Sequence, residues 1–228
     1  MLESIKWLGH ASFVIKAEKV IYIDPWKLKD GEPADIILIT HDHYDHCCPE
    51  DVQKIMKPDT VIVATPDAAA KFKGNVKTMK PGDSLTVEGV PIEAVHAYNP
   101  RKQFHPKKQM GVGYIVTVVK KSLMGVGVAA RPEGGIPPHV FDKETVRIYH
   151  LGDTDFIPEM QNIKADIALV PVGGTYTMDA EEAAKAVNSF MPKVAIPMHW
   201  GEIVGSEKDA QRFKELAHCE VKILTPEK

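Results

Sequence analysis

The amino-acid sequence predicts an α/β fold, and three observations support that class. Short runs rich in β-branched and aromatic residues recur in the first half of the chain, separated by turn-forming residues. The run from Ile36 to Thr40 shows no polar alternation, as a strand buried on both faces requires. After residue 146, strand-like runs alternate with segments whose apolar residues recur at helical spacing. Because the 228 residues show no break in composition, we expect a single domain over residues 1–228.

The first elements along the chain are predicted to be strands. Four short segments have this pattern: Ile5–Leu8, Ser12–Lys16, Val20–Asp24 and Ile36–Thr40. Pro49 then stands at an expected first helical turn, followed by the apolar positions Val52 and Ile55. Val61–Ala64 is the next predicted strand, and a short helix is expected after Pro66.

The remainder of the chain is predicted to continue as a meander and then as alternating strands and helices. The meander extends from Ser84 to Val119. The segment from Lys120 to Thr145 is rich in Gly and Pro and long for a hairpin, so we expect a flap, a lid or a contact within a homo-oligomer. The later predicted strands are Val146–Tyr149, Asp166–Val170, Val194–Met198 and Val221–Leu224, and the helices cover Ala180–Met191 and Ala210–Ala217.

Composition narrows the classes of function. The net charge is −3 and the basic residues are scattered, which disfavours nucleic acid as a partner. No apolar run is long enough to span a membrane, and the first residues lack the pattern of a signal peptide. Three cysteines, two of them adjacent, form no disulfide framework. We therefore expect a cytoplasmic protein without a nucleic-acid or membrane partner.

Residues able to bind metal fall repeatedly after the C-terminal ends of predicted strands. His41, His43, Asp45 and His46 follow the buried run that ends at Thr40. Asp153 follows another strand, and His199 follows a third. Ligands gather beyond these ends in sheets with parallel strands, and zinc binds imidazole nitrogen and carboxylate oxygen. The pattern therefore predicts a metal site in which these six side chains meet.

The same residues carry a resemblance to a known family. His-x-His-x-Asp-His after a buried strand is a signature of the metallo-β-lactamase superfamily, and the similarity continues through Trp7–His10, Ile23–Pro25, His150–Asp155 and Pro197–His199. The chain resembles the branch of ascorbate-6-phosphate lactonase-like proteins and hydrolases of unassigned substrate. This resemblance implies a four-layer αβ/βα sandwich, with one sheet from each half of the chain and the metals at one edge of the sheets.

The resemblance also implies a set of ligands for two divalent ions. His41 and His43 would bind the first metal, while Asp45, His46 and His199 would bind the second and Asp153 would bridge both. Asp24 matches an acid that holds the ligand histidines in place. The third ligand of the first metal is expected to be His105, with His96 as the alternative. Zinc is the expected metal, and manganese and iron also suit such ligands.

The implied function is metal-dependent hydrolysis of a small-molecule ester or lactone, with a phosphorylated substrate included. Two metals would share a water and lower its pKa, giving a bridging hydroxide as the nucleophile. Asp45 is the candidate catalytic residue, which would orient that nucleophile or protonate the leaving group. A phosphodiesterase and a metal-binding protein without turnover are the alternatives.

Several neighbouring features have two interpretations. Cys47 and Cys48 are expected to pack as small apolar residues, with a thiolate ligand as the alternative. Residues 173–177 are either a tight loop before a helix or a cradle of backbone N–H groups for an anion. The basic residues around His105 either draw a phosphate to the metals or are solvated: Arg101, Lys102, Lys107 and Lys108. His10 is expected to support the wall of the site or to make a hydrogen bond in the core, and not to bind metal.

Overall fold

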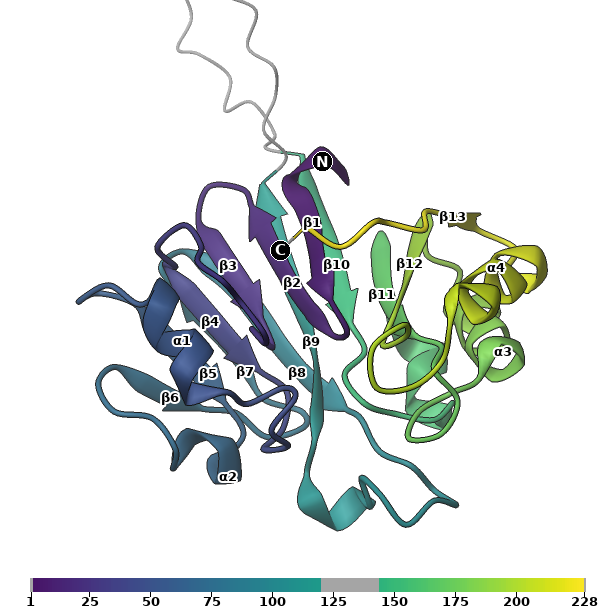
Figure 1. The fold of residues 1–228 in the computed structure, drawn as a ribbon, viewed down its shortest axis with the longest axis horizontal. Helices are drawn as coiled ribbons and strands as arrows, with labels where there is room; N and C mark the ends of the chain where they lie inside the picture. The colour runs from purple at the N-terminus through teal and green to yellow at the C-terminus, as the bar shows by residue number, and fades with distance from the viewer. Residues whose placement is uncertain (1, 120–143, 228) are drawn as a thin grey trace, which may run out of the picture.

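The computed structural model describes residues 2–119 and 144–227, which form two β-sheets face to face with helices outside (Figure 1). The first sheet has the order β1 (Ile5–Gly9), β2 (Ser12–Lys16), β3 (Val20–Ile23), β4 (Ile36–Ile39), β5 (Val61–Ala64), β6 (Val76–Thr78). The second has the order β13 (Glu220–Val221), β12 (Val194–Met198), β11 (Ile167–Pro171), β10 (Thr145–His150), β9 (Val112–Val119), β8 (Val90–His96), β7 (Ser84–Val87). Each half of the chain therefore contributes one sheet, as predicted.

Helices cover the outer face of each sheet and complete the four layers. Helices α1 (Pro49–Ile55) and α2 (Pro66–Ala69) pack on the first sheet, and α3 (Ala180–Phe190) and α4 (Glu207–Leu216) pack on the second. The described residues also contain the 3-10 turns η1 (Leu2–Ser4), η2 (Lys107–Gln109) and η3 (Pro158–Asn162). The predicted α/β class and the four-layer sandwich are both confirmed.

Each sheet joins an antiparallel part to a parallel part. Strands β1 to β3 pair antiparallel, and β3 to β6 pair parallel. In the second sheet β7 to β10 pair antiparallel, and β10 to β13 pair parallel. Parallel neighbours need crossover connections, and α1, α2, α3 and α4 each lie in one of them. The carboxyl ends of the parallel strands therefore meet at one edge of each sheet.

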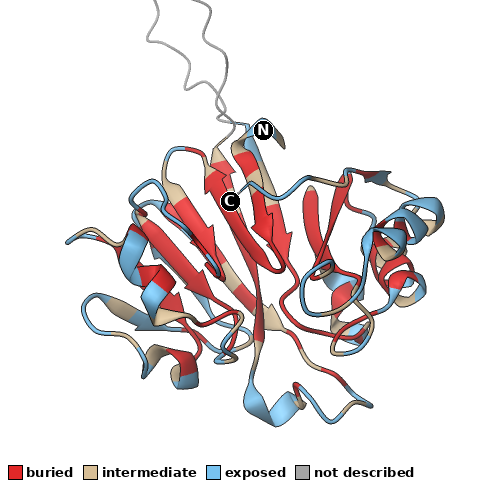
Figure 2. Ribbon diagram, in the orientation of Figure 1, coloured by how far each residue is buried: buried red, intermediate tan, exposed pale blue. Residues whose placement is uncertain are grey.

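Burial explains why the central strands read as continuous apolar runs. In β4, Ile36 and Leu38 face the core between the sheets, while Ile37 and Ile39 face the core under α1. Every residue of β4, β5, β11 and β12 is buried, because a layer covers both faces of each strand. Figure 2 shows this as buried strands flanked by helices whose outer faces are exposed. Removing apolar side chains from water on both faces is the main force that stabilises such a layered fold.

The last strand of the second sheet is shorter than the sequence predicted. The last strand was expected at Val221–Leu224, but β13 covers only Glu220–Val221. The chain then leaves the sheet edge, since Leu224 packs against the core between the sheets and Glu227 N donates to Trp7 O at 2.8 Å. The expected excursion falls on residues 120–143, which lie outside the described residues. At its two ends Val119 pairs with Thr145.

No helix in the described ranges is long and apolar enough to cross a membrane.

Candidate metal centre

Loops from both sheets bring a cluster of histidine and aspartate side chains together. The loop after β4 supplies His41, His43, Asp45 and His46, the loop after β10 supplies Asp153, and the loop after β12 supplies His199. His105 comes from the connection between β8 and β9. The six residues predicted from strand ends, and His105 with them, therefore lie in one place, as the sequence predicted.

One group of nitrogen atoms has the geometry of a site with three histidines. His41, His43 and His105 each offer a ring nitrogen, and these atoms lie within 4.8 Å of one another. His43 Nδ1 is 3.1 Å from His41 Nε2 and 3.0 Å from His105 Nε2. Three imidazoles that converge from two loops are a typical ligand set for a transition metal. His96, the alternative to His105, instead lies with its ring 6.0 Å from that of Tyr98.

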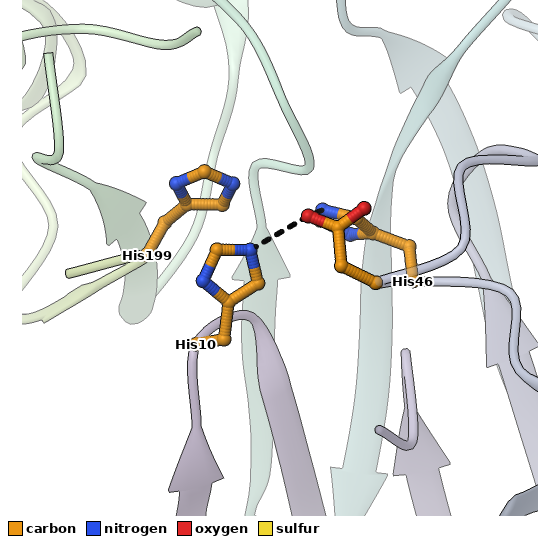
Figure 3. A group of neighbouring side chains, drawn as sticks. His10, His46 and His199 are labelled. Carbon is orange, nitrogen blue, oxygen red and sulfur yellow. Dashed lines mark hydrogen bonds and ion pairs between the residues drawn. The ribbon is translucent and has the colours of Figure 1, made fainter. Parts of the chain in front are cut away.

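A second group lies beside the first and includes a residue that the sequence did not assign as a ligand. His10, Asp45, His46 and His199 also offer atoms within 4.8 Å of one another. Figure 3 shows the rings of His10, His46 and His199 directed toward one another from separate loops. His10 Nε2 lies 3.0 Å from Asp45 Oδ2, and its ring centroid is 3.8 Å from that of His199.

His10 is wholly buried, and its ring nitrogen belongs to the second group of candidate donor atoms. It lies in the turn between β1 and β2, far from the other members in sequence. The one sequence signal for it is its place in the Trp7–His10 segment, which matched the family pattern. Its backbone carbonyl also accepts from His199 N at 2.8 Å, so this turn positions a second member of the cluster.

Asp153 joins the two groups. Its Oδ1 lies 3.4 Å from His46 Nε2, and its Oδ2 lies 3.1 Å from His199 Nε2. The same Oδ2 is 3.4 Å from His105 Nε2, on the side of the first group. The carboxylate thus lies beside members of both groups, with Oδ2 between His105 of the first group and His199 of the second, as a bridging ligand would.

The donor atoms fit a bound cation, because several of them are buried without a hydrogen-bond partner. His46 Nε2, Asp153 Oδ1 and His199 Nε2 are buried and make no hydrogen bond. Buried polar atoms without a partner are uncommon, and three that converge on one point call for a ligand. Imidazole nitrogen and carboxylate oxygen suit a divalent transition metal. The residues present therefore fit the metal that the sequence predicted.

Asp24 holds two of the candidate ligands in the required tautomer. Its Oδ2 accepts from His46 Nδ1 at 2.8 Å and from Thr40 Oγ1 at 2.6 Å. Because the Thr40 hydroxyl donates to Asp24, it accepts from His41 Nδ1, which is 3.0 Å away. Both imidazoles thus carry a proton on Nδ1 and leave the Nε2 lone pair for a metal. The buttressing role expected of Asp24 matches this geometry.

Four residues of the site have a positive φ angle, a backbone conformation that residues other than glycine seldom adopt. The φ angles are 51° at His10, 47° at Asp24, 52° at His105 and 58° at His199. Each such residue costs of order 1 kcal/mol or more and persists only where its surroundings hold it. Asp24 N donates to Leu38 O, and Asn99 N donates to His105 O. Strain of this kind concentrates at functional sites.

The pKa shifts leave most of the cluster in the protonation states that metal ligands need, which are neutral histidine and ionised aspartate. Burial lowers the pKa of His41 well below its usual value and also lowers the pKa of His105, so both are neutral at pH 7. Burial opposes ionisation of Asp45, but the hydrogen bond from His10 and the charge of His46 lower its pKa to about 2. Burial likewise opposes ionisation of Asp153, yet His199 and His46 hold its pKa well below its usual value.

His46 differs from the other histidines because its neighbours are anionic. Burial by itself lowers the pKa of this imidazole, but the charges of Asp153 and Asp24 outweigh it and raise the pKa well above its usual value. In the absence of a cation, a proton on His46 therefore balances the two carboxylates. A metal at Nε2 would take the place of that proton.

Cys47, Cys48 and His150 lie near the cluster in sequence but outside its candidate metal groups. Cys47 packs in the core under α1, and burial raises the pKa of its thiol to about 12. Cys48 is half-buried, and burial raises its pKa to about 11. Neither is in a candidate metal group of the described residues. His150 is packed rather than part of the cluster, with its Nε2 donating to Ala11 O at 2.8 Å.

Residues 173–177 form a tight strand-to-helix loop, the first of the two interpretations. Gly174 N donates to Met178 O and Thr175 N donates to Gly173 O, so these N–H groups are used within the loop. Asp179 caps α3 by accepting from Glu182 N at 2.8 Å.

Two of the four basic residues around His105 are engaged in the structure. Lys102 Nζ donates to Asp155 Oδ1 at 2.5 Å, to Gly174 O at 3.2 Å and to Thr177 O. Lys107 Nζ lies 2.8 Å from Glu159 Oε1. Lys102 therefore joins the His105 loop to the loop before α3, and it is not free to draw an anion to the cluster.

A hollow of about 270 Å³ opens on the cluster. His43, Asp45, His105 and Asp153 form its polar side. Tyr44, Phe104, Tyr176 and Ile203 form the remainder of its lining. The hollow therefore gives a small molecule access to the candidate ligands.

Comparisons with known proteins agree with this geometry. Residues 4–199 match the family model of the beta-lactamase superfamily domain. A metal-dependent hydrolase of Thermoplasma acidophilum is 32% identical over 239 residues, covering 95% of this chain and 92% of that protein. A metal-dependent hydrolase of Methanopyrus kandleri is 32% identical over 245 residues, covering 97% and 96%.

Solved structures show the same architecture. A candidate metal-dependent hydrolase from Parabacteroides distasonis has a TM-score of 0.77 at 33% identity, covering 97% of this chain and 93% of that one. A metallo hydrolase from Ignicoccus hospitalis has a TM-score of 0.72 at 22% identity, covering 98% and 95%, which is a likeness of fold alone.

Proposed function

This chain belongs to the metallo-β-lactamase superfamily of metal-dependent hydrolases, and we propose that it hydrolyses small-molecule esters or lactones with two divalent cations. The observation that carries the proposal is the position of Asp153, between a group of three histidines and a second group that contains Asp45, His46 and His199. A carboxylate between two ligand groups supports a dinuclear centre.

The first group would hold one cation through His41, His43 and His105, and the second would hold the other through Asp45, His46 and His199. When bound, two divalent cations supply an activated water and a positive field for the oxyanion that forms during attack on a carbonyl. The imidazole nitrogen and carboxylate oxygen donors suit zinc, which we propose as the metal, with manganese and iron as the alternatives.

Asp45 is the proposed catalytic residue of the chain itself. It lines the hollow, and its Oδ2 accepts a hydrogen bond from His10. This hydrogen bond fixes the orientation of the Asp45 carboxylate. The position of its other oxygen is therefore set by the protein. At pH 7 the group is ionised, since its pKa is about 2. It would therefore accept a hydrogen bond from the attacking water and orient it toward the substrate.

His10 is then a positioning residue, because it acts through Asp45 and through His199. Asp24 has the same role for His46 and, by way of Thr40, for His41. Such outer partners keep the ligand rings in one orientation and so maintain both metal affinity and rate.

The proposed function is tested by hydrolysis of lactones, carboxylic esters, thioesters and phosphodiesters by protein of measured metal content. We expect cleavage of a carbonyl class, and a fall of more than about 100-fold in His199→Ala, because even outer partners of ligands contribute 10–100-fold. His218→Ala is the matched control, since this histidine is exposed and outside the cluster.

Cleavage of phosphodiesters alone would assign the site to phosphoryl chemistry instead. A protein that binds two cations and cleaves none of these substrates would support a metal-binding role without turnover.

We also propose a cytoplasmic location. All three cysteines are free thiols, as is usual in a reducing compartment. Fractionation of cells that carry the tagged protein tests this, and recovery from a membrane or extracellular fraction would contradict it.

A further inference from the structure

The hollow over the cluster has two chemically different sides. One side consists of four members of the candidate metal groups: His43, Asp45, His105 and Asp153. The other side consists of four large side chains that are aromatic or aliphatic: Tyr44, Phe104, Tyr176 and Ile203. We call these four residues the apolar rim. A molecule whose reactive group reaches the cluster must place the rest of its atoms against this rim.

The apolar rim concentrates the exposed apolar surface of the protein. In residues 2–119 and 144–227, the exposed large apolar side chains are Tyr44, Phe104, Met110, Met191 and Ile203. Three of these line the hollow, and Tyr44 is 68% exposed. Exposed apolar side chains gathered around one hollow mark a binding site, because exposing them to water is unfavourable unless a partner covers them.

The rim is held at a defined distance from the cluster. Tyr44 lies in the chain between His43 and Asp45, and Phe104 directly precedes His105. The rings of Phe104 and Tyr176 meet edge to face with centroids 4.9 Å apart. These links make the rim part of the same structure that positions the candidate ligands.

Tyr176 is connected to the cluster through its backbone. Asn99 Nδ2 donates to Tyr176 O at 2.6 Å and lies 3.2 Å from His105 Nδ1. On the opposite side, the ring of Tyr44 lies 6.2 Å from that of Trp26. A substituent against the rim is therefore held in a constant relation to the reacting group.

The hollow offers no side-chain cation to a substrate. None of its eight lining residues is Lys or Arg. Lys102 is bound to Asp155 and to two carbonyl oxygens of the loop before α3. Lys27 lies 3.0 Å from Glu202 and over the ring of Trp26. A phosphate on the substrate would meet apolar side chains and two carboxylates, without an Arg or Lys partner of the kind that phosphate sites use.

We infer that this site selects uncharged esters or lactones with an apolar substituent, and that a phosphate group on the substrate brings no gain. The inference rests on the proposed function, since it assumes that the cluster carries out carbonyl hydrolysis. The reacting carbonyl lies over Asp45 and Asp153, and the substituent lies against the apolar rim.

The first measurement is kcat/KM along a series of γ-lactones, from γ-butyrolactone to γ-octalactone. A fully buried methylene changes affinity about 4-fold, so an open rim is expected to give about 2-fold per methylene. Across the four added methylenes kcat/KM should rise by about 10-fold or more. The second measurement compares glucono-δ-lactone with its 6-phosphate, and we expect no increase from the phosphate.

Variants locate the effect. In Phe104→Ala and Tyr44→Ala, the ratio of kcat/KM for γ-octalactone to that for γ-butyrolactone should fall toward 1. Met191→Ala is the matched control, because Met191 is exposed, apolar and outside the hollow, and its ratio should equal that of the unaltered protein. An unchanged ratio in both rim variants would overturn the assignment to the rim.

A binding measurement separates this inference from the proposed function. Calorimetric titration with the unreactive ketones 2-octanone and 2-butanone requires no turnover, and tighter binding of the longer ketone, lost in Phe104→Ala, supports the rim. If lactones are cleaved without dependence on chain length, or the phosphorylated lactone is preferred, the inference fails while the proposed function stands. If no lactone or ester is cleaved, the proposed function fails and the inference fails with it, and the ketone titration then decides only whether the rim binds apolar chains.

Discussion

Asp24 Oδ2 and His46 Nδ1 lie 2.8 Å apart and join the end of β3 to the loop after β4, with both side chains wholly buried. The same carboxylate accepts from the Thr40 backbone and hydroxyl, and through Thr40 it also orients His41. One buried acid therefore sets the orientation of a candidate ligand in each metal group. This arrangement shows why a residue that touches no substrate can affect both proposed cations.

Asp24→Asn should lower the affinity for metal by about 10- to 100-fold, as loss of an outer partner does in other metal sites. An amide at this position cannot accept from His46 and Thr40 with the charge that the carboxylate provides. Competition against a chromophoric chelator measures the change. Asp51→Asn is the control, because Asp51 is also buried but accepts from Lys27 N at 2.6 Å, outside the cluster. Equal affinity in Asp24→Asn and the unaltered protein would contradict the buttressing role.

His105→Ala should lose one equivalent of bound metal, whereas His96→Ala should retain the full amount. His105 Nε2 lies 3.0 Å from His43 Nδ1 within the three-histidine group, while His96 lies with its ring near Tyr98. Metal content by mass spectrometry after dialysis distinguishes the two. Loss of metal in His96→Ala with retention in His105→Ala would reverse the assignment.

Lys102→Met should destabilise the protein without weakening the attraction of anionic substrates. Asp155 is 5% exposed and would lose its charged partner, so we expect the free energy of unfolding to fall by about 1–3 kcal/mol. Urea denaturation of the metal-free protein measures this fall. Lys107→Met is the control with a more exposed ion pair, and it should show a smaller change. A rise in KM confined to anionic substrates would instead support a recruiting role for Lys102.

Asp35 and Asp166 have equivalent places in the two halves and should give the protein an acid-sensitive stability. Each precedes a central parallel strand, and each accepts from the backbone of the neighbouring strand, from Val20 N and from Arg147 N. Burial opposes ionisation of both, but Lys57 beside Asp35 and the Arg147 hydrogen bond at Asp166 lower their pKa values.

Because the folded pKa lies below the unfolded value of about 3.9, the stabilisation is present above that pH and is lost as the pH falls through the folded value. The difference in unfolding free energy between the unaltered protein and Asp35→Asn or Asp166→Asn should therefore shrink below about pH 4. Urea titrations in a chelator from pH 3 to 7 measure it. Asp59→Asn, at a position whose side chain is 78% exposed, should show little difference at any pH.

Much of this protein could be predicted from the sequence because the relevant signals are local. The central strands read as apolar runs since both faces of each are buried, and that pattern needs only neighbouring residues. The candidate ligands in the His41–His46 segment were identifiable for the same reason, since one turn of chain carries four possible metal donors directly after such a strand. The end of a parallel strand is where ligands gather, so Asp153 and His199 could be placed with them.

The tertiary structure alone decided the features that depend on loops meeting across the fold. His10 meets Asp45 over 35 residues of sequence, and Lys102 meets Asp155 over 53. Such contacts cannot be read from sequence periodicity, because two hydrogen-bond partners far apart in the chain leave no local pattern around either residue. The shortened last strand has the same cause, since Leu224 leaves the sheet edge to pack in the core between the sheets. The sequence by itself determined most of the strands and most of the candidate metal donors, and long-range packing decided their supports and the apolar rim above them.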